Sequence, residues 1–61
     1  MTREELFEEY RRSLGLALKR HDELLQELSI TPYRDRIPLY YKIGVYEGII
    51  EDLEVALLAL R

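Results

Sequence analysis

The sequence lacks almost every residue that usually cross-links a very small protein. It has no cysteine and a single histidine, which excludes disulfides and thiolate metal sites and leaves too few ligands for a structural zinc site. A domain of 61 residues buries only about 60% of the surface of its unfolded chain, and it usually needs a disulfide, a metal or a partner chain. Association with another chain is therefore the predicted source of stability.

A basic surplus and a long apolar run are also missing. The net charge is −3, whereas a protein that binds nucleic acid usually carries a dominant basic surface. Acidic residues interrupt the most apolar segment, so we predict no membrane span. The first residues, MTREELFEEY, contain no apolar core of a signal peptide, and we expect a cytoplasmic protein.

What the sequence does contain is helical periodicity. Thr2 and Glu5 have the spacing of a capping box, which predicts that a helix begins there. The apolar residues that follow alternate in spacing between three and four, which predicts a one-sided amphipathic helix over about residues 3–28. Its stripe consists of Phe7, Tyr10, Leu14, Ala17, His21, Leu24 and Leu28.

Two prolines interrupt the pattern in the segment SITPYRDRIP, because each disfavours α conformation at the residue before it. We predict a connection over residues 29–35, with Asp35 as the N-cap of a second helix and Pro38 in its first turn. A start at Thr31, with Pro32 as the first helical residue, is the alternative and would give a short separate turn.

The second helix, about residues 36–60, is apolar on more than one side. One stripe can pack on the first helix, and it comprises Leu39, Ile43, Tyr46, Ile50, Leu53, Leu57 and Leu60. A second face is the predicted dimer interface, and its residues are Val45, Ile49, Asp52, Val55, Ala56 and Ala59. Since a neighbouring helix covers only one face, the chain (residues 1–61) is predicted to be an all-α antiparallel two-helix hairpin that pairs into a dimeric four-helix bundle.

No constellation of catalytic or ligand-binding residues is present, so we predict a non-enzymatic protein without a cofactor, a catalytic site or a metal site. His21 is typical of a boundary histidine that is hydrogen-bonded across the bundle, rather than of a pH switch or catalytic group. The strip of Glu47, Glu51 and Glu54, with Asp52 beside it, favours a solvated acidic edge over a divalent-cation site.

Tyrosine and arginine, which are enriched at binding hot spots, gather in the segment YRDRIPLYYK. The candidate partner-binding residues there are Tyr33, Arg34, Arg36, Tyr40 and Tyr41. The alternative is that the tyrosines close the end of the bundle with their hydroxyls in water.

Gly44 and Gly48 form a G-x-x-x-G spacing, which indicates either close approach by another group or simple tolerance of glycine.

The predicted function is a small protein–protein interaction module, a homodimeric hairpin with a regulatory role that also binds another protein. The alternative is a four-helix-bundle dimer that binds nucleic acid, like RNA-binding regulators. It would use the turn segment or the basic residues of the first helix, which are Arg11, Arg12, Lys19 and Arg20.

Overall fold

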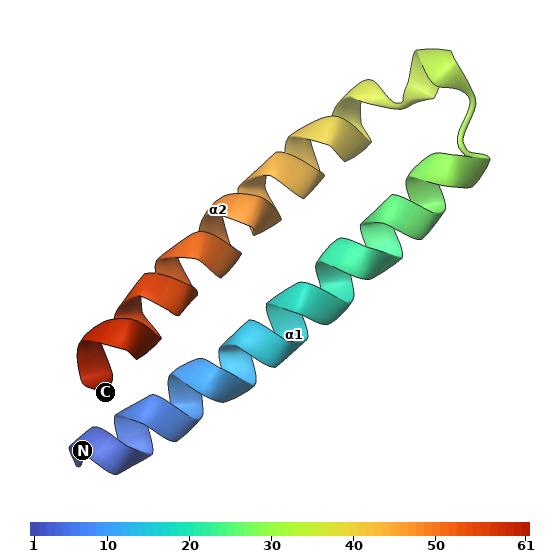
Figure 1. The fold of residues 1–61 in the computed structure, drawn as a ribbon. Helices are drawn as coiled ribbons and strands as arrows, with labels where there is room; N and C mark the ends of the chain where they lie inside the picture. The colour runs from blue at the N-terminus through green and yellow to red at the C-terminus, as the bar shows by residue number, and fades with distance from the viewer.

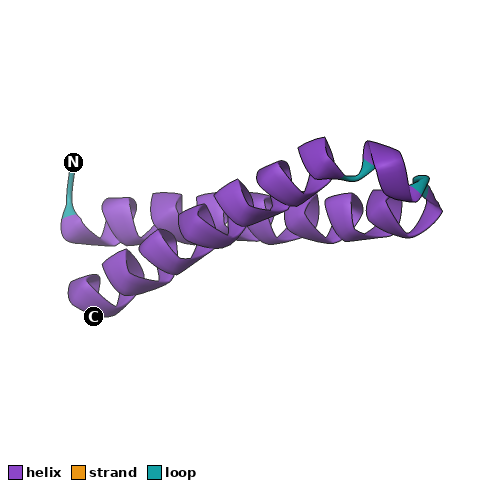
Figure 2. Cartoon of the chain, turned by 90° about the horizontal axis from the view of Figure 1, so that it is seen from above, coloured by secondary structure: helices purple, strands orange, loops and turns teal.

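The chain folds as a hairpin of two antiparallel helices. The computed structural model describes residues 1–61, with α1 over Arg3–Ile30, a short 3-10 turn η1 over Tyr33–Asp35 and α2 over Ile37–Leu60. The two helices run side by side, and both termini lie at the same end (Figure 1). A view from above shows one pair of overlapping helices with no further layer (Figure 2). The predicted all-α hairpin is confirmed.

The predicted capping box begins α1. The backbone N–H of Glu5 donates to the Thr2 hydroxyl at 3.1 Å, and the backbone N–H of Thr2 donates to the Glu5 carboxylate at 3.4 Å. These bonds satisfy donors that a helix start leaves unpaired. The helix continues two residues beyond the predicted end, to Ile30. Pro32 disfavours α conformation at Thr31, the residue directly before it, so Ser29 and Ile30 remain helical.

The turn contains the short separate helix that the alternative start suggested, although it begins one residue later, with Pro32 as its N-cap. Thr31 is extended (φ −92°, ψ 133°), as expected before Pro32, and η1 follows as a separate short turn. The prediction of Asp35 as N-cap is wrong: Arg36 holds that position in α conformation and makes no side-chain capping bond. Pro38 lies at the start of α2, where its missing N–H removes no helical hydrogen bond.

The core is small and lies closer to the turn than to the termini. Leu24 is fully buried and packs with Leu39 and Ile43, and Leu28 and Tyr46 add partly buried surface. Ala17 is the only other buried residue of the chain. The predicted stripes of the two helices therefore do meet, but they enclose few side chains completely.

Arginines connect the ends of the two helices. At the open end, Arg3 donates from Nε to the carbonyl of Leu60 at 2.9 Å and from Nη2 to the carbonyl of Arg61 at 3.1 Å. At the turn, Nε of Arg36 donates to the carbonyl of Thr31 at 2.9 Å. These carbonyls belong to helix C-termini, which lack intrahelical partners.

The molecule is a rod. Its extents are 47 × 15 × 14 Å and its radius of gyration is 14.3 Å. A compact domain of this length has a radius of gyration of about 10.5 Å. The hairpin therefore exposes both flanks of each helix along its length.

Replacing Leu24 by alanine tests this core. Leu24→Ala should lower the free energy of unfolding by about 2–4 kcal/mol, because it leaves a cavity at the one fully buried side chain. The measurement is urea denaturation followed by circular dichroism at a fixed chain concentration. The control is Leu25→Ala, which removes the same atoms from a side chain that is 43% exposed. An equal loss in both variants would contradict the location of the core.

Candidate interaction surfaces

The predicted dimer face lies uncovered along α2. Val45 is 44% exposed, Ile49 41% and Val55 60%. Asp52 and Ala59 are also exposed, and Ala56 is half-buried. At about 100° per residue, this face points away from the side of α2 that carries Leu39 and Ile43 and packs on α1.

We call this surface, extended by the neighbouring Tyr41 and Gly48, the outer face of α2. It consists of Tyr41, Val45, Gly48, Ile49, Asp52, Val55, Ala56 and Ala59. Asp52 is the one charged residue among these eight. Solvent-facing sides of helices in soluble proteins are normally rich in charge, as the far side of α1 is here, so the outer face of α2 has the composition of a covered surface.

Neither central glycine of α2 is needed by the hairpin itself. A Cβ atom built on Gly44 or Gly48 would meet nothing within 4 Å. A glycine within a helix costs about 1 kcal/mol relative to alanine. Nothing in the chain's own packing accounts for that cost, and the space above Gly48 opens onto the outer face.

A shallow groove continues the apolar surface toward α1. Leu16 and Ala17 border it on α1, and Tyr46, Ile49 and Leu53 border it on α2. Leu16 is not part of the apolar stripe of α1, but in this groove it lies next to other apolar side chains. Its other neighbours along the groove on α1 are polar: Ser13, Lys19, Arg20 and Glu23. The apolar surface is consequently concentrated on α2.

The turn end carries a second group of exposed apolar and aromatic side chains. Tyr33 is 82% exposed and Tyr41 75%, and Ile30, Ile37 and Tyr40 are exposed beside them in sequence. Arg34 is exposed as well. Arg36 differs from the other candidate residues, because its guanidinium is partly buried and bonds the carbonyl of Thr31.

His21 lies at the boundary between the helices and bonds across them. Its Nε2 atom is 3.3 Å from Oε1 of Glu47, with the histidine side chain 22% exposed and the glutamate 64%. This confirms the expected histidine hydrogen-bonded across the two helices. The contact connects α1 to α2.

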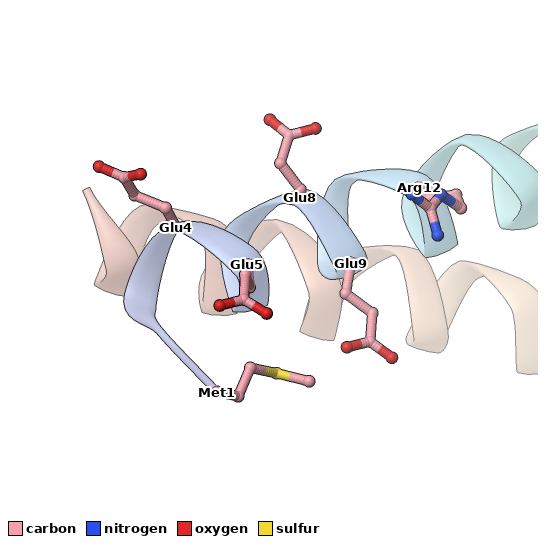
Figure 3. Close-up of a pocket in the computed structure, with 6 residues that line it drawn as sticks. All are labelled: Met1, Glu4, Glu5, Glu8, Glu9 and Arg12. Carbon is pink, nitrogen blue, oxygen red and sulfur yellow. The ribbon is translucent and has the colours of Figure 1, made fainter.

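The acidic residues do not converge on one point. Glu47, Glu51 and Glu54 are exposed along α2. At the start of α1, a shallow concave surface is lined by Met1, Glu4, Glu5, Glu8, Glu9 and Arg12. The carboxylates of Glu4 and Glu8 point away from those of Glu5 and Glu9 (Figure 3). The structure contains no group of three or more histidine, aspartate or glutamate side chains that could hold a metal ion.

The basic residues of α1 do not all lie on one face: Arg12 and Lys19 share the far side of the helix with Glu8 and Glu23. Arg11 and Arg20 are nine residues apart and point to opposite sides of the helix, at about 180°. Nη1 of Arg11 is also 3.7 Å from Oε1 of Glu8, and this ion pair offsets the charge of Arg11. Glu8 with Arg12 and Lys19 with Glu23 have i,i+4 spacing but form no ion pair.

No protein-family model, curated protein or solved structure matches the chain. Neither helix combines the length and the apolar character that crossing a bilayer requires.

The contact between His21 and Glu47 should contribute little to stability. We expect Glu47→Ala to lower the free energy of unfolding by less than about 1 kcal/mol, because the carboxylate is mostly exposed to water. Thermal unfolding followed by circular dichroism measures the change, with Glu51→Ala, one turn further along α2, as the matched control. A loss that exceeds that of the control by several kcal/mol would show that the contact with His21 contributes more to stability than expected.

Proposed function

We propose that the chain is a small non-enzymatic interaction module that works as a homodimer, with the outer face of α2 buried between two copies. The observation that carries this proposal is the size of the exposed surface. The hairpin exposes 4974 Å². A folded monomer of its mass, 7.3 kDa, exposes about 4,200 Å². The excess of roughly 800 Å² is what each partner contributes to a standard protein–protein interface.

The chemistry of the two helices supports the same arrangement. The outer face of α2 has one charged residue in eight, whereas the far side of α1 carries Glu8, Arg12, Lys19 and Glu23. Two hairpins that pair through α2 would form a four-helix bundle with α2 at its centre and α1 facing water. A two-fold axis suits this arrangement, because each copy offers the same face to the other.

The turn end supplies the surface that we propose for a second protein. Tyr33 and Arg34 lie outside the outer face of α2 and project at the end of the rod, so they would remain accessible in a dimer built through α2. Large aromatic side chains and arginine are the residues that most often anchor protein contacts. Each dimer would present two such ends. If binding of the second protein depends on having both, dimerisation controls that binding, and the role of the module is regulatory.

A charge placed in the outer face should break the dimer. Ile49→Asp would bury an unpaired carboxylate between the copies, and we expect a monomeric or unfolded chain. Sedimentation equilibrium gives the mass, for which the wild type should show twice 7.3 kDa or more. Circular dichroism reports the helix content.

The matched control is Leu18→Asp, which places the same charge in α1 at a leucine that is 49% exposed and lies away from the outer face of α2. This variant should keep the dimer mass. A monomeric wild type, or a folded Ile49→Asp dimer with unchanged dissociation constant, would contradict the proposal.

Site-specific photocrosslinking tests the turn end. A benzophenone amino acid at Tyr33 should form a discrete adduct with another protein in cells of the source organism. The same group at Glu8, on the charged face of α1, should form none. Mass spectrometry of the adduct identifies the partner and the crosslinked peptide. Equal labelling from both positions, or adducts made only of the chain itself, would contradict a heterologous site at the turn.

A further inference from the structure

We infer that the two copies pair through antiparallel α2 helices, with the two-fold axis passing the level of Ile50. This inference rests on the proposed homodimer and adds to it the orientation, the register and the one charge that limits its affinity.

Six of the eight residues of the outer face form a line whose spacing is the same when read from either end, with Ile49 and Ala56 beside it. Along one line of this face the intervals are four, three, four, three and four, and the residues are Tyr41, Val45, Gly48, Asp52, Val55 and Ala59. Residue 50 is the midpoint of this line. A helix that runs in the opposite direction therefore presents matching positions at every step, which a two-fold axis at Ile50 requires. The alternation of three and four is also the spacing of a seam between two helices.

The sizes of the side chains favour the antiparallel orientation. In that register Tyr41 lies opposite the partner's Ala59, and Val45 lies opposite the partner's Val55. Gly48 lies opposite the partner's Asp52, and the space above Gly48 is open for that side chain. Helix interfaces fill space best when large residues meet small ones.

A parallel pair would place identical residues opposite one another. Tyr41 would meet the partner's Tyr41, Gly48 would face the partner's Gly48 across a void, and the two Asp52 carboxylates would be directly opposed. Parallel alignment also brings the like ends of the helix dipoles together, whereas the antiparallel orientation joins unlike ends. Both considerations favour the antiparallel pair.

Asp52 is the charged residue of this line, and its copies lie on the two sides of the axis. In the antiparallel register they are separated by about 6 Å along the helix direction in addition to the distance between the helices. The two carboxylates repel at this separation, and no basic side chain lies on the line to offset them. The charge of Asp52 therefore weakens the dimer.

Engineered cysteines distinguish the orientations, because the natural chain has none. In the antiparallel register Val45 faces the partner's Val55, while the two copies of residue 45 lie about 15 Å apart along the helix direction. A disulfide requires Cα atoms about 4.4–6.8 Å apart. In a glutathione redox buffer, Val45→Cys alone and Val55→Cys alone should remain reduced, whereas a mixture of the two should form the mixed disulfide on a non-reducing gel.

The outcomes separate the inference from the proposed function. Efficient crosslinking of Val45→Cys to itself, in a chain that sediments as a dimer, would overturn the antiparallel register and leave the homodimer in place. A dimer that forms none of these disulfides would place the interface elsewhere and overturn the inference. A monomeric wild type would overturn the homodimer and the inference with it.

Neutralising Asp52 provides the second measurement. Asp52→Asn should lower the dimer dissociation constant roughly three- to tenfold by removing the repulsion. Glu54→Gln is the matched control: it changes the net charge equally but lies about 140° around α2 from the line, in a groove with Phe7 and Leu57. Fluorescence anisotropy of labelled chain measures both constants. An unchanged or weakened Asp52→Asn dimer, or equal tightening in both variants, would overturn the position of Asp52 beside the axis.

Discussion

A hairpin of two helices has only one internal seam, and here that seam fully encloses little more than Leu24 and its two neighbours on α2, Leu39 and Ile43. Each helix necessarily leaves its remaining circumference uncovered. For α1 this is of little consequence, because most of its outer positions are charged. For α2 it leaves an apolar surface in water, which costs free energy until another surface covers it. The proposed homodimer follows from this imbalance between the two helices.

Polar contacts determine how the two ends of the rod are held. Neither helix has a basic residue in its last turn. Instead, arginines from outside supply the positive charge: Arg36 bonds the end of α1 through Thr31, and Arg3 bonds the end of α2 through Leu60. Each arginine satisfies a free carbonyl and complements the negative end of a helix dipole. These hydrogen bonds therefore hold the two helices together at both ends of the hairpin, in addition to the small core.

The surface of the hairpin has three regions with different chemistry. The outer face of α2 is largely apolar, the far side of α1 is charged, and the turn end is aromatic with one free arginine, Arg34. No pocket among them combines enclosure with convergent polar groups, which is the usual mark of a site for a small ligand. The proposed function through contacts between macromolecules uses these surfaces separately, with Tyr33 and Arg34 accessible while α2 is engaged.

Much of the fold followed from local sequence alone, because a helix depends on residues three and four positions apart. The start at Thr2, the break at Pro32 and the position of Pro38 are all determined by neighbouring residues. The turn was less predictable. Asp35 has a side chain suited to an N-cap, but the hydrogen bond from Arg36 to Thr31 and the short helix η1 occupy that stretch of chain instead.

The sequence by itself determined that the chain forms two helices, which faces are apolar, and that α2 carries more apolar surface than one neighbour can cover. Only the tertiary structure decided the register between the helices. That register pairs His21 with Glu47, 26 residues away, and brings Arg3 to the carbonyl of Leu60. It also showed that the space above Gly48 is open. These contacts depend on how two rigid helices slide and rotate against one another, and no local pattern in either helix specifies that.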